Sequence, residues 1–332
     1  MKYRTLGRTG IEVSEIALGT GPISGLMTGD DIERQTATLR KAQQLGVNWI
    51  DTAAGYGKGQ SETSLGIALA QLDNSLGPMH VATKVRITSK QNQDVDAEIR
   101  TSVEQSLERL GRESVTLLQL HNAVTPRRGD QATSLTPDDI LRSNGVLSAF
   151  RQLQNEGLCR YLGITGTGDA DSLIRLVETA EFDTIQIPFN LVNPTAGYSV
   201  PPGFQETNYG QIANLARDKE MGVFAIRVFA AGALLGNPPT DYTRNSPYFP
   251  LSLYQRDMAA ADRMVGHLQD TMSLKEAALR FPLTHVAVTA AIVGVKSDAE
   301  INEVVELSQR GPIDEGILAG ILARMLDSTT DI

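Results

Sequence analysis

The chain alternates short β-like runs with amphipathic helical stretches from one end to the other, and this alternation restricts the folds open to it. The strand pattern occurs in eight runs: Glu15–Leu18, Trp49–Asp51, Val81–Lys84, Thr116–Leu120, Tyr161–Thr165, Thr184–Pro188, Val223–Arg227 and Ala291–Val295. Helical patterns lie between them and include Asp31–Leu45, Ser61–Leu72, Asp94–Leu110, Val146–Glu156, Ala170–Thr179, Tyr209–Lys219 and a last one that starts near Asp298. Glycines that follow a helical run and precede a strand are typical of helix ends, and they are Gly46, Gly111, Gly157 and Gly222. Eight such units in succession predict an α/β fold, a (β/α)8 TIM barrel of eight parallel strands.

The length of the chain fits this interpretation. Two domains would be the simplest expectation for 332 residues, but a (β/α)8 barrel reaches this size as one domain. We therefore expect a single domain over residues 1–332, with an N-terminal hairpin over 1–14 whose turn is Gly7–Gly10, and a C-terminal helical tail over 313–332 that becomes polar at its end.

Two long segments interrupt the repeat after strands six and seven, at Asn190–Asn208 and Leu235–Pro250. Loops of this length in a compact domain are usually functional, and these two lie on the barrel face where active sites are built. Aromatic residues in or near them are candidates for the wall of a substrate pocket, although they could equally pack inside the loops: Tyr198, Phe204, Tyr209, Phe229, Tyr248 and Phe249.

Composition narrows the class of protein. A hydrophobic fraction of 41% and a charged fraction of 21% are ordinary for a globular protein with a large core. The net charge of −9 argues against nucleic acid or an anionic membrane as the main partner. One cysteine, Cys159, permits no intrachain disulfide, and no run approaches the ~18 apolar residues of a membrane span. We expect a cytoplasmic enzyme acting on a small molecule, and the sequence leaves its oligomeric state open.

Polar residues gather where the expected strands end. Asp51 ends the second strand, Lys84 the third and His121 follows the fourth, while Tyr56 lies five residues after Asp51. On this face of a barrel, polar residues at strand ends are typical of catalytic groups. A lysine at a strand end is often only a solvated charge and a lone histidine is often structural, but the convergence of several such residues favours chemistry.

These four residues suit the reduction of a carbonyl, in which the alkoxide formed by hydride transfer needs a proton. Tyr56 is a plausible acid, and an ammonium at Lys84 would lower its pKa from about 10 by stabilising the phenolate. Asp51 would keep Lys84 charged and oriented, and a neutral His121 could donate a hydrogen bond to the carbonyl oxygen. The arrangement requires no metal site.

The sequence around these residues resembles the aldo-keto reductase family. The resemblance rests on Leu6–Ser14, Asp51–Gly57, Gln60–Glu62 and Gly157–Gly163, which occur in order, and it covers roughly residues 1–310. It implies that Asp51, Tyr56, Lys84 and His121 form the family's catalytic tetrad. It also implies a nicotinamide dinucleotide bound without a glycine-rich Rossmann loop, and no Gly-x-Gly-x-x-Gly motif opens a helix here.

The resemblance also implies cofactor-binding positions. Gly19 and Thr20 would form the floor near the ribose, and Gln186 matches the glutamine that helps to hold the carboxamide. Thr165-Gly166 replaces the usual Ser-Asn pair, and Arg227 stands where an aromatic residue normally stacks on the nicotinamide, which leaves the redox preference open. The adenosine-phosphate site corresponds to the eighth strand and the start of the last helix, and its residues here are Gly294, Lys296, Ser297 and Glu300.

The choice between NADP(H) and NAD(H) depends on these last residues. Lys296 and Ser297 suit a 2′-phosphate, whereas the carboxylate of Glu300 would repel it. We lean to NADP(H), with NAD(H) as the alternative.

Other functions stay open at this stage. One is an NAD-dependent sugar dehydrogenase of the same family, which the N-terminal third resembles loosely. A second is a Schiff-base enzyme with Lys84 as its nucleophile, which the neighbouring Asp51 disfavours. A third is a non-catalytic regulatory subunit that binds the cofactor, as channel β-subunits with this barrel do.

Overall fold

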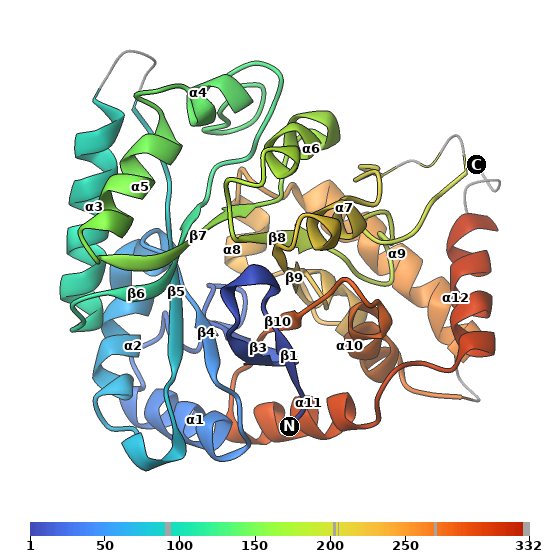
Figure 1. Ribbon diagram of the computed structural model, residues 1–332. Coiled ribbons are helices and arrows are strands. Elements are labelled where there is room, and N and C mark those ends of the chain that lie inside the picture. Colours follow the sequence, from blue (N-terminus) through green and yellow to red (C-terminus); the bar gives the residue numbers. More distant parts are fainter. Residues whose placement is uncertain (90–93, 202–203, 205, 269–270, 328–332) are drawn as a thin grey trace.

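A closed barrel of eight parallel strands forms the centre of the computed structural model, which describes residues 1–89, 94–201, 204, 206–268 and 271–327 (Figure 1). The strands follow one another around the barrel in chain order, and β10 closes the ring against β3. Their bounds are β3 Ile16–Gly19, β4 Trp49–Asp51, β5 His80–Val85, β6 Val115–Leu120, β7 Cys159–Thr165, β8 Thr184–Pro188, β9 Gly222–Ile226 and β10 Ala290–Gly294. The expected (β/α)8 TIM barrel is confirmed.

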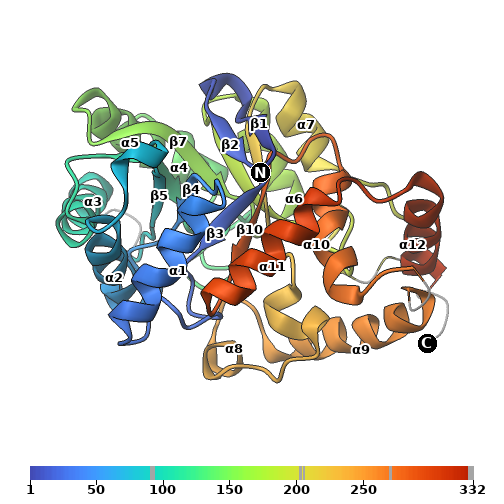
Figure 2. The same cartoon turned by 90° about the horizontal axis from the view of Figure 1, so that it is seen from below.

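Helices surround this barrel and pack on its outer face (Figures 1 and 2). Those of the repeat are α1 Ile32–Gln44, α2 Gln60–Leu69, α3 Val95–Leu110, α5 Val146–Asn155, α6 Ala170–Glu178, α7 Ile212–Asp218, α10 Leu274–Thr284 and α11 Asp298–Gln309. The additional helices are α4 Pro137–Leu141, α8 Asp241–Asn245, α9 Leu251–Leu268 and α12 Glu315–Asp327. Short polar side chains start several of them: Asp31, Asp94 and Asp169 each accept a hydrogen bond from a backbone N–H of the first turn.

The core has two layers because strand side chains alternate in direction. One set of residues points outward and packs under the helices, as Val81 and Val85 of β5 do. The other set points into the barrel and fills its lower end together with the N-terminal hairpin: Leu6, Ile11, Val13, Ala17, Trp49, Ala82, Leu117, Phe224 and Ala290.

The expected N-terminal hairpin is present and closes the bottom of the barrel. It pairs β1 Tyr3–Thr5 with β2 Glu12–Ser14, and a 3-10 turn over Gly7–Thr9 joins them. Leu6 is fully buried at its tip, and Arg4 donates hydrogen bonds to the carbonyl oxygens of Val288 and Leu283, far along the chain. The sequence interpretation of Gly222 as a helix stop is wrong, because Gly222 begins β9. A Cβ on residue 222 would lie only 2.2 Å from Leu6 Cδ1, so the packing of the hairpin against the barrel requires a glycine here.

The region after the seventh barrel strand differs from expectation. The strand before the second long loop ends at Ile226, so Arg227 lies just outside it. That loop also contains a 3-10 segment, Ala230–Leu235, and the short helix α8. Helix α12 lies within the tail, whereas residues 328–332 lie outside the described residues, as do 202, 203 and 205 of the first loop. None of the helices in the described ranges is both long and apolar enough to cross a membrane.

Leu6→Ala should lower the free energy of unfolding by about 2–5 kcal/mol, because it empties a fully buried position at the barrel floor. Urea denaturation followed by circular dichroism measures this loss. Leu76→Ala, at a side chain that is 53% exposed, is the control and should change stability little. A loss below about 1 kcal/mol for Leu6→Ala would mean that the hairpin is not part of the cooperative core.

Candidate active site

The four expected catalytic residues meet at the carboxyl end of the barrel, where each lies at the end of a strand or in the turn that follows it. Asp51 is the last residue of β4, and Tyr56 opens the 3-10 turn that follows it. Lys84 points into the barrel because it shares the direction of Ala82 on β5. His121 directly follows β6, where its backbone N–H donates to the carbonyl of Val85 at 2.8 Å.

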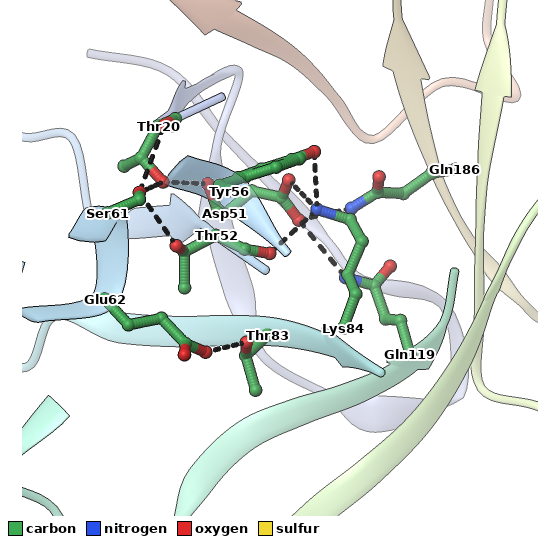
Figure 3. Close-up of polar contacts among 10 residues, drawn as sticks. All are labelled: Thr20, Asp51, Thr52, Tyr56, Ser61, Glu62, Thr83, Lys84, Gln119 and Gln186. Carbon is green, nitrogen blue, oxygen red and sulfur yellow. Dashed lines mark hydrogen bonds and ion pairs between the residues drawn. The ribbon is translucent and has the colours of Figure 1, made fainter. Parts of the chain in front are cut away.

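Lys84 is the centre of this group (Figure 3). Its ammonium donates hydrogen bonds to the Asp51 carboxylate, to the Thr52 carbonyl oxygen at 2.9 Å and to the Tyr56 hydroxyl at 3.4 Å. Lys84 is 2% exposed and Asp51 is 3% exposed, so both charges have left water. The ion pair and the additional hydrogen bonds offset the cost of burying them.

The second carboxylate oxygen of Asp51 is held by two amides. Gln119 Nε2 donates to Asp51 Oδ1 at 3.1 Å, and Gln186 Nε2 donates to the same atom. Sequence reasoning missed Gln119. The signal was present, because Gln119 is a polar residue inside the apolar run of β6 and is paired in register with Lys84 on β5. Gln186, expected at the carboxamide, lies within β8 and contacts Asp51 here.

Burial sets the protonation of the site. Burial raises the pKa of Tyr56 above 10, and the nearby Lys84 ammonium only partly opposes this shift. The expectation of a net lowered Tyr56 pKa is therefore wrong, although the sign of the Lys84 contribution is as expected. Burial works against the charged form of Lys84, but Asp51 and the phenol raise the pKa of Lys84 overall.

His121 is neutral at physiological pH. Burial lowers its pKa well below 6.5, and the positive charges of Arg86 and Lys84 lower it further. Its ring meets the Tyr56 ring edge to face, with centroids 5.5 Å apart. A neutral imidazole beside a protonated phenol gives the site two hydrogen-bond donors without an added charge.

A chain of hydroxyls fastens the start of α2 to the barrel rim. Ser61 Oγ donates to Thr20 Oγ1 at 2.8 Å, Thr20 Oγ1 donates to the Asp51 carbonyl at 3.0 Å, and Thr52 Oγ1 lies 3.1 Å from Ser61 Oγ (Figure 3). These contacts, made by Ser61 at the start of α2, hold the turn that carries Tyr56 against the barrel rim.

The adjoining Glu62 has a supporting role in the same region. It is fully buried, accepts a hydrogen bond from Thr83 Oγ1 and pairs with Arg109 of α3 at 2.7 Å. Because Thr83 precedes Lys84, this contact fixes the strand that carries the ammonium.

The expected cofactor residues also lie at or near the carboxyl ends of barrel strands. Gly19 and Thr20 follow one another at the end of β3, and Gly294 of β10 is paired in register with Gly19. Thr165 ends β7, and its Oγ1 is buried with no hydrogen-bond partner in the described residues. An orphaned hydroxyl at this place suits a ligand that brings both a donor and an acceptor, as the nicotinamide carboxamide does.

The start of α11 is arranged around Ser297. Ser297 Oγ caps the helix by accepting from the Glu300 N–H at 3.3 Å, and the Glu300 carboxylate accepts from the Lys296 N–H at 2.7 Å. Glu300 thus turns back onto the loop, while the Lys296 side chain is exposed.

Arg227 lies directly after β9 with a left-handed backbone, at φ 55°. Its guanidinium pairs with Asp257 of α9 at 2.8 Å and lies 4.5 Å from the centre of the Phe249 ring. Both partners of the ion pair are about nine-tenths buried, so this is not a solvated charge at the rim. Non-glycine residues with positive φ are uncommon and often mark functional sites.

The aromatic candidates of the two long loops divide into two groups. Tyr198 packs edge to face on His285 at the end of α10 and so fastens the first loop to that helix, while Tyr209 is buried. Tyr248 and Phe249 instead each lie on an arginine at the mouth of the barrel.

Comparison with known proteins decides the family. A sequence profile of the Aldo/keto reductase family matches residues 15–320. The chain belongs to this family. It is 26% identical over 329 residues to L-galactose dehydrogenase of Arabidopsis thaliana, covering 97% of this chain and 94% of that protein. It is also 26% identical over 322 residues to aldo-keto reductase YhdN of Bacillus subtilis (strain 168), covering 93% and 89%.

A solved structure shows the same fold. The aldo-keto reductase AKR11C1 from Bacillus halodurans, in its holo form, superimposes with a TM-score of 0.71 at 21% identity, over 98% of this chain and 96% of that one. Membership in the aldo/keto reductase family makes this protein an oxidoreductase of the group that uses nicotinamide cofactors.

Lys84→Met should lower the free energy of unfolding by about 3–5 kcal/mol, because it leaves the buried Asp51 carboxylate without its counter-charge. Adding Asp51→Asn to Lys84→Met should recover part of that loss, which a double-mutant cycle in urea would measure. The exposed pair Lys275–Glu303 is the control, where Lys275→Met should cost no more than about 1 kcal/mol. Strictly additive losses would contradict the coupling.

Proposed function

We propose that this aldo/keto reductase transfers hydride between NAD(P)(H) and the carbonyl carbon of an aldehyde or ketone, or of the matching alcohol, with Tyr56 as the general acid and base. One observation carries the proposal: a buried ammonium, Lys84, bonds at once to a carboxylate and to a phenol that a neutral histidine faces.

Each residue has a separate task. The cofactor supplies the hydride when it is bound. His121 donates a hydrogen bond to the carbonyl oxygen and aligns it. Tyr56 Oη gives its proton to that oxygen as negative charge develops there, and the Lys84 ammonium at 3.4 Å stabilises the phenolate that remains. In the reverse direction the phenolate removes the proton from the alcohol.

The raised pKa of Tyr56 suits reduction, because burial keeps the phenol protonated at neutral pH. The Lys84 ammonium still makes the phenolate more accessible than burial alone would. Asp51 acts through Lys84, since it holds the ammonium within reach of the phenol.

The cofactor residues are assigned on chemical grounds. Thr165 Oγ1 is free to hydrogen-bond the carboxamide, and Gln186, whose amide nitrogen is committed to Asp51, would accept through its oxygen. Gly19, Thr20 and Gly294 would lie under the ribose and pyrophosphate. Arg227 would lie beside the nicotinamide, held there by Asp257.

A sugar dehydrogenase is the second candidate, and the similarity to L-galactose dehydrogenase along nearly the whole chain favours it. The same four residues would then work in the direction of oxidation. Oxidation of aldoses with NAD⁺ and NADP⁺, set beside reduction of short and aromatic aldehydes, separates the two candidates.

The Schiff-base alternative has less support. Its nucleophile must be a neutral amine, whereas Lys84 has a raised pKa and donates to Asp51 and to the Thr52 carbonyl. Borohydride trapping of a substrate adduct on Lys84 would revive it.

Tyr56→Phe should reduce turnover by about 100- to 10,000-fold, because it deletes the proton donor and keeps the ring. Cofactor affinity, followed by fluorescence titration, should stay nearly the same. Tyr3→Phe, which removes the hydroxyl of an exposed tyrosine on the hairpin, is the matched control. If Tyr56→Phe retained a third or more of wild-type turnover, Tyr56 could not be the acid. A wild type that binds the cofactor but turns over no carbonyl compound or alcohol would instead fit the alternative of a non-catalytic cofactor-binding subunit.

We further propose that the protein prefers NADP(H), with NAD(H) as the alternative. The exposed Lys296 ammonium can pair with a 2′-phosphate. Ser297 caps the start of α11, where the helix dipole favours an anion. Glu300 is turned onto the Lys296 N–H, which ties up the carboxylate that would otherwise repel the phosphate.

Lys296→Ala should weaken NADP(H) binding at least about fivefold and leave NAD(H) binding unchanged, because only the former carries the 2′-phosphate. Titrating both cofactors against wild type and variant measures this. Equal losses for both cofactors, or a wild type that prefers NAD(H), would assign control of the site to Glu300.

A further inference from the structure

Arg86 is a positive group at the mouth of the barrel that the proposed chemistry does not use. It follows β5 by one residue and has the same direction as Ala82 and Lys84, which point into the barrel. Its neighbours Val85 and Ile87 point outward into the helical layer. Arg86 is therefore one layer above Lys84, about 6–7 Å along the strand.

The strand register places Arg86 next to the reacting groups. Lys84 pairs with Gln119 on β6, so extending the pairing by two residues sets Arg86 beside His121. The hydrogen bond from the His121 N–H to the Val85 carbonyl shows that the pairing does continue. The charge of Arg86 also reaches the His121 imidazole, where it helps to lower the histidine pKa.

The guanidinium of Arg86 packs against an aromatic ring, and few of its N–H donors have a partner among the described residues. Its Cζ lies 3.9 Å from the centre of the Tyr248 ring, and Nη1 donates to Thr133 Oγ1 at 3.2 Å. A guanidinium has five N–H donors, and within the described part of the chain no carboxylate pairs with this one. Burial without a counter-charge lowers the pKa of Arg86.

The other arginine of the mouth is different. Arg227 also lies on an aromatic ring, but Asp257 neutralises it. Likewise Asp51 neutralises Lys84. Of the two described cations that act on His121, Lys84 and Arg86, only Arg86 has no carboxylate partner, and the N–H edge of a guanidinium matches the geometry of a carboxylate.

We propose that Arg86 is a specificity-determining residue that binds a carboxylate on the substrate, so that the preferred substrate is a carbonyl compound bearing an acid group. The inference rests on the proposed function. Tyr56 and His121 would donate hydrogen bonds to the carbonyl oxygen of the substrate. Its acid group would lie one side-chain layer above them and accept hydrogen bonds from the Arg86 guanidinium.

The position of Arg86 separates it from the residues assigned to the adenosine phosphate of the cofactor. Lys296 and Ser297 follow β10, which is three strands away from β5 in the ring order β10-β3-β4-β5. Cofactor affinity should therefore be indifferent to Arg86.

The test compares wild type with Arg86→Gln on two matched pairs, succinic semialdehyde with butanal and 4-carboxybenzaldehyde with benzaldehyde. Wild type should prefer the acid of each pair at least tenfold in kcat/KM. Arg86→Gln should lose about 10- to 100-fold on the acids, mostly through KM, and less than threefold on the neutral aldehydes. Arg86→Lys should fall between the two.

Two controls separate recognition from structure. Arg127→Gln removes an exposed arginine whose side chain is 85% exposed in the loop after β6, and should leave the acid preference unchanged. The thermal midpoint and the cofactor affinity of Arg86→Gln should match those of wild type. Equal losses on acids and neutral aldehydes would assign Arg86 a structural role and overturn the proposal, and so would a wild type without acid preference.

Binding without turnover keeps the inference separate from the proposed function. Calorimetric titration of the protein saturated with NADP⁺ with benzoate should give binding in wild type that Arg86→Gln loses. If no aldehyde is reduced but benzoate binds through Arg86, the reaction is wrong and the anion site stands. If benzoate does not bind to wild type, the anion site is wrong.

Discussion

The interaction on which the active end of this barrel depends is the buried ion pair between Lys84 and Asp51. A charged ammonium in this position is tolerable only because a carboxylate, a backbone carbonyl and a phenol accept all three of its hydrogen bonds. Gln119 and Gln186 in turn satisfy the far oxygen of Asp51. Four strands thus converge on one charge pair, and the position of Tyr56 follows from it.

The barrel supplies this convergence by simple geometry. Alternation along a strand sends every second side chain inward, and the stagger between strands stacks those side chains in layers. Ala82, Lys84 and Arg86 occupy three successive layers of one strand. The lowest belongs to the apolar floor, the middle one to proton transfer and the highest, by our inference, to substrate choice.

The sequence predicted the fold and the convergence of the tetrad because both depend on periodic patterns and on strand ends, which a single chain displays. It predicted the pairing of Asp51 with Lys84, but not the two amides that hold the other Asp51 oxygen. Gln119 sits inside an apolar run, and only the pairing of β5 with β6 shows that it faces Lys84. It also gave the wrong direction for the Tyr56 pKa, because the balance between burial and the Lys84 charge depends on how deeply the ring is enclosed. The partner of Arg227 could not be identified for a similar reason: Asp257 is thirty residues away, on a helix whose position no local pattern reveals.

The N-terminal hairpin has a consequence for how the chain folds during synthesis. Several of its contacts are with the last third of the described chain: Leu6 packs over Gly222, and Arg4 donates to the carbonyl oxygens of Leu283 and Val288. The hairpin therefore cannot complete these contacts until most of the barrel that follows it in the chain has been synthesised. The floor of the barrel precedes the eight strands in the chain, and it is among the last parts to be closed.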